Sequence, residues 1–175
     1  REDFLEPRLD PLRTRRELRA HLPPAVHTWS SLRLLPMVLM IPRAAAALVR
    51  GYVRSGSAVP GLGVTTPHVA QARCGLLDVD VFMHMNNAAF FSHCELARWQ
   101  LIAEVGAIPW IQRNKAVFLV GSTVTRFRRE VRPLQAFEVH TQVLGWDERS
   151  LVFEHNFRLS ADSPPLSQTL CRAVV

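Results

Sequence analysis

Residues 87–104, NAAFFSHCELARWQLIAE, decide which fold the chain can adopt. Apolar side chains recur there at spacings of three and four, the period of an amphipathic helix; they are Phe90, Phe91, Cys94, Ala97, Leu101, Ile102 and, just beyond, Val105. Polar residues fall mostly between them, namely His93, Glu95, Arg98 and Glu104. Asn86 or Asn87 can cap the start, and Gly106 can end the helix in a left-handed conformation. The pattern predicts one long helix over these residues.

After this helix, the hydrophobic pattern changes to that of strands. Four stretches rich in β-branched and aromatic residues are separated by turn-like sequences; they are residues 116–128, 136–146, 150–160 and 166–175. Short loops make consecutive strands antiparallel neighbours, so we expect a four-stranded meander. A further short strand is expected around residues 72–77.

The order of these elements predicts an α+β fold in which one antiparallel sheet wraps around one long helix. Strands and helices do not alternate as a parallel sheet would require. The outer strands of such a sheet keep open edges, which favours pairing with a second copy or docking on another protein.

The formal net charge of +6 is unevenly distributed along the chain. Residues 1–70 hold ten arginines and five acidic residues, and eight of the twelve prolines. Residues 71–175 are almost neutral. We therefore expect a basic, Pro/Arg-rich extension and linker over residues 1–70 and a separate domain over residues 71–175. The extension lacks a basic run interleaved with aromatic residues, so nucleic acid is not an expected partner.

An apolar run at residues 34–49 is the only candidate for a membrane span, but Pro36, Pro42 and Arg43 interrupt it and it is too short. A short helix over residues 42–53 is expected instead. Its arginines suit either an anionic membrane surface, contacted between Leu34 and Arg54, or an acidic protein surface. The alternative is a helix packed on its own domain.

The three cysteines are odd in number and widely spaced, which favours a reducing compartment. The histidines outside the motif described below show no metal-ligand spacing, so we expect neither a metal nor another cofactor. The chain begins with Arg1, as a processed or partial product does. Together with the arginine-rich front segment, this start favours a mitochondrial location, with an endomembrane location as the alternative.

The motif LDVDVFMHMNN at residues 77–87 precedes the helix, which then carries Phe90, Glu95 and Ala97-Arg98. This set resembles the DxDxxxHxNN signature of hot-dog-fold acyl-CoA thioesterases. The resemblance extends to the thioesterase superfamily member 6-like branch through later segments at residues 133–139 and 144–147. It covers about residues 73–175. Many relatives have Gly where this chain has Met83, a bulkier residue beside the approach of the thioester.

The resemblance implies a hot-dog dimer that hydrolyses an acyl thioester, such as an acyl-CoA, at sites on the subunit interface. By position, Asp80 is the nucleophile or general base, and His84, Asn86 and Asn87 orient the site and substrate. The residues themselves agree, because a carboxylate just before a helix can act on a carbonyl whose oxygen is held by free N–H groups of the helix start.

Other readings of these residues remain open. Candidate ligands for the phosphates of coenzyme A are Arg126, Arg128 and Arg129, but they equally suit a solvated strand end. Asn86 and Asn87 also fit helix caps alone, and His84 fits a buried core histidine. Three tryptophans are expected to be packing residues: Trp99, Trp110 and Trp146.

A second function is also open at this point. The domain can instead be a noncatalytic hot-dog subunit, paired with itself or with another hot-dog chain. In that case residues 1–70 attach it to a large, mitochondrial, membrane-associated complex in which its role is structural.

Overall fold

The computed structural model describes residues 34–174, with side chains from Met40 onward. It separates the chain into two compact units, Arg1–Met40 and Ile41–Val175, and the following concerns the second. The sequence-based expectations for residues 1–33 lie outside the described residues, and the division into residues 1–70 and 71–175 stays a prediction.

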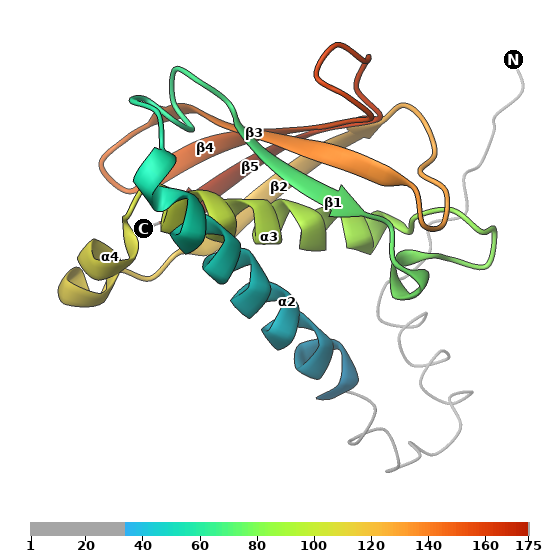
Figure 1. Ribbon diagram of the computed structural model, residues 1–175, viewed down its shortest axis with the longest axis horizontal. Coiled ribbons are helices and arrows are strands. Elements are labelled where there is room, and N and C mark those ends of the chain that lie inside the picture. Colours follow the sequence, from blue (N-terminus) through green and yellow to red (C-terminus); the bar gives the residue numbers. More distant parts are fainter. Residues whose placement is uncertain (1–33, 175) are drawn as a thin grey trace, which may run out of the picture. The chain divides into compact units, whose positions relative to one another are not determined.

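The helices and strands of the described chain follow one another in the order that Figure 1 labels. They are α2 (Leu34–Arg54), η2 (Ser55–Ser57), β1 (His68–Arg73), η3 (Leu76–Asp78), α3 (Asn87–Glu104), α4 (Ile108–Asn114), β2 (Leu119–Phe127), β3 (Ala136–Trp146), β4 (Ser150–Arg158) and β5 (Ser167–Val174). The predicted α+β class is confirmed, but β1 begins earlier than expected and α2 extends beyond both ends of the expected helix. The short helix α4 was not predicted.

The five strands form one antiparallel sheet in the order β1-β3-β4-β5-β2. The expected meander is therefore right for β3, β4 and β5 and wrong for β2, which pairs with β5. The segment after β2 does not turn back as a hairpin: the N–H groups of Arg128 and Arg129 both donate to the carbonyl oxygen of Leu166, just before β5. The chain then passes from β2, at one edge of the sheet, to β3, next to the other edge, and Val131 is fully buried on the way.

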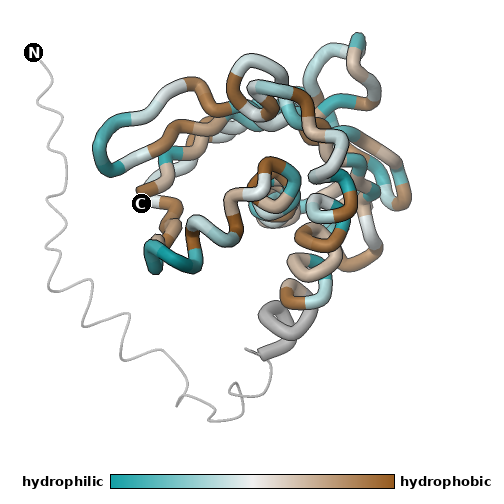
Figure 2. The backbone as a smooth tube through the Cα atoms, turned by 60° about the vertical axis from the view of Figure 1, so that its left-hand side comes forward, coloured by the Kyte–Doolittle hydropathy of each residue, from teal (hydrophilic) through white to brown (hydrophobic). Residues whose placement is uncertain are grey.

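Helix α3 has the predicted bounds, and the sheet curls around it (Figures 1 and 2). The side chain of Asn86 caps it by accepting from the Ala89 N–H at 2.8 Å, and Gly106 takes a positive φ of 71° after its end. Phe90 packs on Phe157, whose ring stacks on that of Phe137. The apolar face of the helix thus forms the core with the concave face of the sheet.

The polar side of α3 is also largely buried, which the spacing did not predict. His93, Arg98 and Glu104 are all buried, whereas Phe91 and Val105 are substantially exposed. Arg98 lies under the sheet with one N–H group 3.2 Å from Nε2 of His155. Burial, with the charges of Arg98 and His68, lowers the pKa of His155 to about 3, so the neutral ring accepts this hydrogen bond.

Helix α2 covers part of the polar side of α3, because the second half of α2 packs directly on it. Ala47 is fully buried, and Gly51 lies so close to α3 that an added Cβ would be 2.2 Å from the carbonyl oxygen of Gln100. Arg54 then pairs with Glu104 at 3.4 Å and donates to the Val69 carbonyl on β1. The alternative of a helix packed on its own domain is what the structure shows from Ile41 onward. No helix among the described residues has the length and apolar character that crossing a membrane requires.

We predict that Gly51→Ala destabilises the protein by about 1–3 kcal/mol, because the new methyl group collides with the backbone of α3. Helix propensity alone would give the opposite sign, since Ala is a better helix former than Gly. Urea unfolding followed by circular dichroism measures the difference. Gly56→Ala is the matched control, because a Cβ at Gly56 meets nothing within 4 Å; equal stabilities of the two variants would contradict the close packing.

Candidate active site

The motif residues form a tight loop between β1 and α3. Val79 and Met85 make an isolated antiparallel bridge, and the Asp80 N–H donates to the carbonyl oxygen of His84 at 2.9 Å. One carboxylate oxygen of Asp80, Oδ1, accepts from the N–H groups of Phe82 (2.9 Å) and His84 (3.3 Å). Its other oxygen has no hydrogen-bond partner among the described residues, and the side chain is exposed. The loop thus fixes the carboxylate of Asp80 and leaves one oxygen free to react.

Met83 adopts a left-handed backbone conformation in this loop, with a φ of 62°. Such a conformation is unfavourable for residues that carry a Cβ and costs little for Gly. This is a physical reason for the Gly that the family resemblance leads one to expect at this position. The Met83 side chain is mostly exposed, so it gains little packing in return.

We therefore predict that Met83→Gly stabilises the described fold by about 1 kcal/mol, because removal of the left-handed strain exceeds the extra chain entropy of Gly. Phe82→Gly is the control: Phe82 precedes Met83 and is also mostly exposed, but its φ is not positive, so this variant gains no stability. Thermal and urea unfolding compare the two. A loss of stability in Met83→Gly similar to that in Phe82→Gly would contradict the assignment of strain.

The start of α3 lies directly after this loop and offers unpaired backbone donors. Asn87 and Ala88 are exposed first-turn residues, whose N–H groups have no acceptor within the helix. Both polar atoms of the Asn86 side chain already have a partner within the chain. Its oxygen accepts from the Ala89 N–H, and its nitrogen donates to the carbonyl oxygen of Asp78 at 3.0 Å. Asn86 therefore shapes the helix start, and its contact with a substrate stays a prediction.

The other predicted residues are His84 in this loop and three arginines near the end of β2. His84 is half-exposed, with its Nε2 2.8 Å from an oxygen of Glu130, and Glu130 also pairs with Arg132. All three arginines near the end of β2 are exposed: Arg126, Arg128 and Arg129. Arg128 donates twice to the side-chain oxygen of Gln168, as a strand-end residue does. Their predicted roles toward phosphates stay predictions.

A buried charge cluster behind the loop was missed by the sequence analysis. Asp78 Oδ2 accepts from the Gly75 N–H at 3.0 Å and lies 3.1 Å from Nε2 of His93, while its Oδ1 pairs with Arg43 of α2 at 3.0 Å. Burial raises the pKa of Asp78, but the hydrogen bonds from His93 and Gly75 and the charge of Arg43 outweigh it and lower the pKa to about 2. A signal was present, since His93 lies four residues before Ala97 and so shares a helix face with a core residue.

This cluster gives the stability a defined pH dependence. The pKa of Asp78 is lowered from 3.8 to about 2 on folding, so its stabilising contribution of about 2 kcal/mol is complete above pH 4 and is lost as the pH falls toward 2. We predict that Asp78→Asn removes this part of the acid dependence. Urea unfolding between pH 6 and 2.5 should show the wild-type and variant stabilities converging in acid. Asp162→Asn, at an exposed turn, is the control; curves of wild type and Asp78→Asn that stay parallel would contradict the role of Asp78.

A collar of exposed apolar residues flanks Asp80 along the chain. The residues of this collar are mostly solvent-exposed, with Val81 reaching 90%; they are Leu76, Leu77, Val81, Phe82 and Met83. Five exposed apolar side chains within eight residues are typical of a place that a ligand or another protein covers.

An apolar groove of about 760 Å³ lies at the opposite end of α3, between that helix, α4 and the β3–β4 hairpin. Trp99, Trp110 and Trp146 line it. Trp110 and Trp146 are more than half exposed, so the expectation that they are packing residues is wrong. The reason is that α4 extends away from the core and the hairpin leaves the groove open.

Cys74, Cys94 and Cys171 are all buried and free, and Cys94 lies in the core as expected from its place on the apolar face of the helix. Burial raises the pKa of the Cys94 thiol to about 12, so it is not a thiolate at neutral pH. In the part of the chain that the structure describes, no three His, Cys, Asp or Glu side chains are grouped so as to hold a metal ion.

Residues 74–175 match the Thioesterase-like superfamily. The chain belongs to this family. The match begins at Cys74, so it includes the loop with Asp78 and Asp80, α3 and the strands from β2 onward, but not α2 or β1.

Curated relatives agree with this assignment and confirm the resemblance to the member 6-like branch. Protein THEM6 of Danio rerio is 33% identical over 109 residues, which are 62% of this chain and 54% of that protein. Protein THEM6 of Drosophila melanogaster is 27% identical over 100 residues, covering 57% and 52%. Thioesterase poxG of Penicillium oxalicum is 30% identical over 97 residues, covering 47% and 32%. The chain thus spans about half the length, or less, of these relatives.

Solved structures confirm the hot-dog fold. The probable thioesterase YbaW from Escherichia coli superposes with a TM-score of 0.58 at 20% identity, over 61% of this chain and 80% of that one. BH1999 gentisyl-coenzyme A thioesterase gives a TM-score of 0.54 at 15% identity, over 61% and 87%. At such identities the likeness concerns the fold alone.

Proposed function

We propose that the protein hydrolyses an acyl thioester such as an acyl-CoA, with Asp80 as the catalytic carboxylate. The observation that carries this proposal is the position of Asp80: its carboxylate is held by two backbone N–H groups, has one free oxygen and lies in the loop that leads into the start of α3. The matching family has thioesterases among its named members, which supports the reaction type.

The chemistry follows from this geometry. The N–H groups of Asn87 and Ala88, at the positive end of the helix dipole, would bind the thioester carbonyl oxygen and stabilise the negative charge that develops there. As a general base, Asp80 takes a proton from water, whose oxygen attacks the carbonyl carbon; the C–S bond then breaks and the thiolate leaves. As a nucleophile, Asp80 attacks the carbonyl carbon, the C–S bond breaks as the thiolate leaves, and water hydrolyses the resulting anhydride.

In this proposal the remaining predicted residues act around Asp80. His84, held by Glu130, would orient the reacting groups, together with Asn87 at the helix start. Arg126 and Arg129 are exposed and would be available to the phosphates of a coenzyme A ester.

A second copy of the chain would complete the site. Strand β2 forms one edge of the sheet, nearly all its residues are exposed, and these include Leu119, Val124 and Phe127. The other edge strand, β1, has a carbonyl that Arg54 already covers. Pairing of two β2 edges about a two-fold axis satisfies the open edge and sets the two α3 helices antiparallel. The groove at the end of one α3 would then lie near Asp80 of the other copy and hold the acyl group.

A second candidate function is a noncatalytic hot-dog subunit, and the apolar collar around Asp80 favours it, because a partner protein would cover such a surface equally well. In that case residues 1–70 would attach the chain to a larger assembly. The mitochondrial location and the membrane contact of α2 stay predictions.

Asp80→Asn separates these functions. We predict that it lowers the hydrolysis of acyl-CoA esters at least about 100-fold, because the amide neither attacks nor accepts a proton. The measurement is thiol release over a series of acyl chain lengths, with circular dichroism to verify folding. Asp162→Asn is the matched control and should keep full activity, since this exposed side chain lies in the β4–β5 turn.

Two outcomes would contradict the proposal. Unchanged turnover in Asp80→Asn would remove Asp80 from the reaction. A wild-type protein that is folded and dimeric by native mass spectrometry, but hydrolyses none of the esters, would favour the noncatalytic function.

A further inference from the structure

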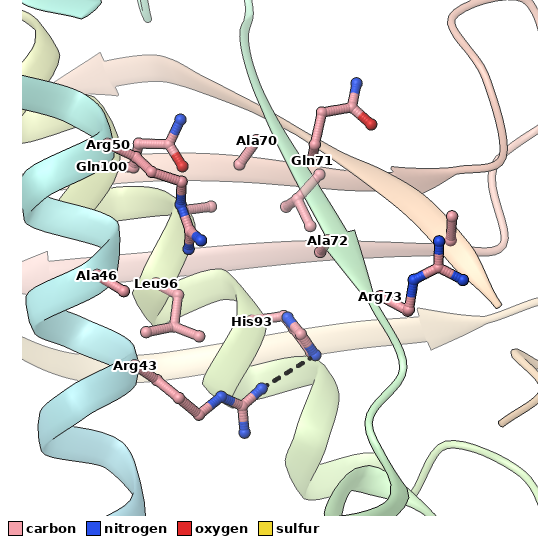
Figure 3. A pocket seen from close by; sticks show the side chains of 13 residues that line it. Arg43, Ala46, Arg50, Ala70, Gln71, Ala72, Arg73, His93, Leu96 and Gln100 are labelled. Carbon is pink, nitrogen blue, oxygen red and sulfur yellow. Dashed lines mark hydrogen bonds between the residues drawn. The ribbon is translucent and has the colours of Figure 1, made fainter. Parts of the chain in front are cut away.

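A pocket of about 500 Å³ opens between α2, β1 and α3, outside the loop of Asp80 (Figure 3). Its described lining includes three arginines, Arg43, Arg50 and Arg73, and no acidic residue. Figure 3 shows Arg43 and Arg50 on α2 and Arg73 at the end of β1. The lining of the pocket thus carries cationic side chains from two elements.

These guanidinium groups keep donors that the chain does not use. The two terminal nitrogens of Arg43 contact the Asp78 carboxylate, and one of them also lies near His93 of the buried cluster. Arg73 donates to the Leu134 carbonyl oxygen, and Arg50 has no ion-pair or hydrogen-bond partner among the described residues. Because a guanidinium group carries five N–H donors in a planar fork, each of the three can still bind an anionic oxygen.

Gln100 adds a neutral polar group to the same lining. The residue is only 4% exposed, lines the pocket and makes no side-chain hydrogen bond with any described residue. Its amide group is not fully enclosed, so it faces the open pocket and can donate to or accept from a ligand there.

Small side chains create the space between these groups. The floor and walls hold five alanines: Ala46, Ala70, Ala72, Ala97 and Ala136. A methyl group fills little volume, so α2 and β1 leave an apolar floor between the cationic side chains. The pocket therefore suits a molecule that is anionic at one end and apolar next to it.

A second pocket of about 360 Å³ continues from the first along α2. The two share Arg50, Gln71 and Gln100 in their linings. Beyond these shared residues, Val49, Val53 and Arg54 line the second pocket, and the two valines are mostly exposed. The cationic pocket thus continues into an open groove in which two valines offer apolar contacts.

We propose that these two pockets bind a single-chain amphiphile with an anionic head group, a carboxylate or a phosphate. The head lies between Arg43, Arg50 and Arg73, which bind its oxygens with charge-assisted hydrogen bonds. The chain runs past Gln100 toward Val49 and Val53. The head-group site uses α2 and β1, which lie outside the family match, and it is independent of the reaction proposed for Asp80.

Titration calorimetry on the full chain tests the proposal, with octanoate, octyl phosphate and inorganic phosphate below any micelle concentration. We expect octyl phosphate or octanoate to bind at least tenfold more tightly than inorganic phosphate. Arg50→Gln and Arg73→Gln should each weaken this binding about tenfold and leave the fold and ester hydrolysis unchanged. Arg113→Gln, on the exposed face of α4, is the matched control and should bind as the wild type does.

A second measurement locates the ligand. In nitrogen-15 NMR spectra, the side-chain amide of Gln100, assigned from its loss in Gln100→Met, should shift on addition of the amphiphile. Binding that is unaffected by both arginine substitutions, or that does not shift this amide, would overturn the proposal. So would binding to anionic phospholipid vesicles without binding of either monomeric amphiphile, because the occupant would then be a membrane surface.

Discussion

The carboxylate of Asp78 holds together three parts of the chain that are distant in sequence. It accepts from the Gly75 backbone at the end of β1, contacts His93 on α3 and pairs with Arg43 on α2. The backbone carbonyl oxygen of Asp78 accepts from the backbone N–H and from the side-chain amide of Asn86, the residue that caps α3. The loop that carries Asp80 is closed between these two anchors, so its geometry depends on a buried ion pair with a helix outside the family match.

Asp78 and Asp80 carry the same side chain only two residues apart, but their surroundings differ. Asp78 is buried, fully hydrogen-bonded and held ionised, so it has no oxygen left for a reaction. Asp80 is exposed, and one of its oxygens is free. The loop's hydrogen bonds thus separate a carboxylate with no free oxygen from one that has a free oxygen. Since Arg43 acts through Asp78, α2 contributes to the order of the site without facing it.

Helix α2 also changes the character of the domain. In a sheet that wraps one helix, the helix face away from the sheet needs its own cover. Here α2 supplies it through Ala47 and Gly51, and the burial of His93 and Glu104 follows from that contact. Where the two helices diverge toward β1, alanines leave room for the arginine-lined pocket. The close packing and the pocket therefore belong to one arrangement.

The sequence alone determined those features that depend on neighbours along the chain. The period of residues 87–104 gave the bounds of α3, Asn86 and Gly106 gave its ends, and the motif placed Asp80 in the loop that leads into a helix start. These features are set by hydrogen bonds and side-chain spacings within a few residues. The positions of β3, β4 and β5 follow from short turns in the same way.

Only the tertiary structure decided what depends on contacts between distant segments. The place of β2 beside β5, the pairing of Asp78 with Arg43 and the exposure of Trp110 and Trp146 have no signal in local spacing. The three arginines of the pocket come from two elements separated by a turn region, and Gln100 from a third. The spacing of apolar residues shows which side of a helix or strand is apolar, but it does not show which other element covers the polar side. In this protein the sheet covers the apolar side of α3 and α2 covers part of its polar side, so both sides are buried.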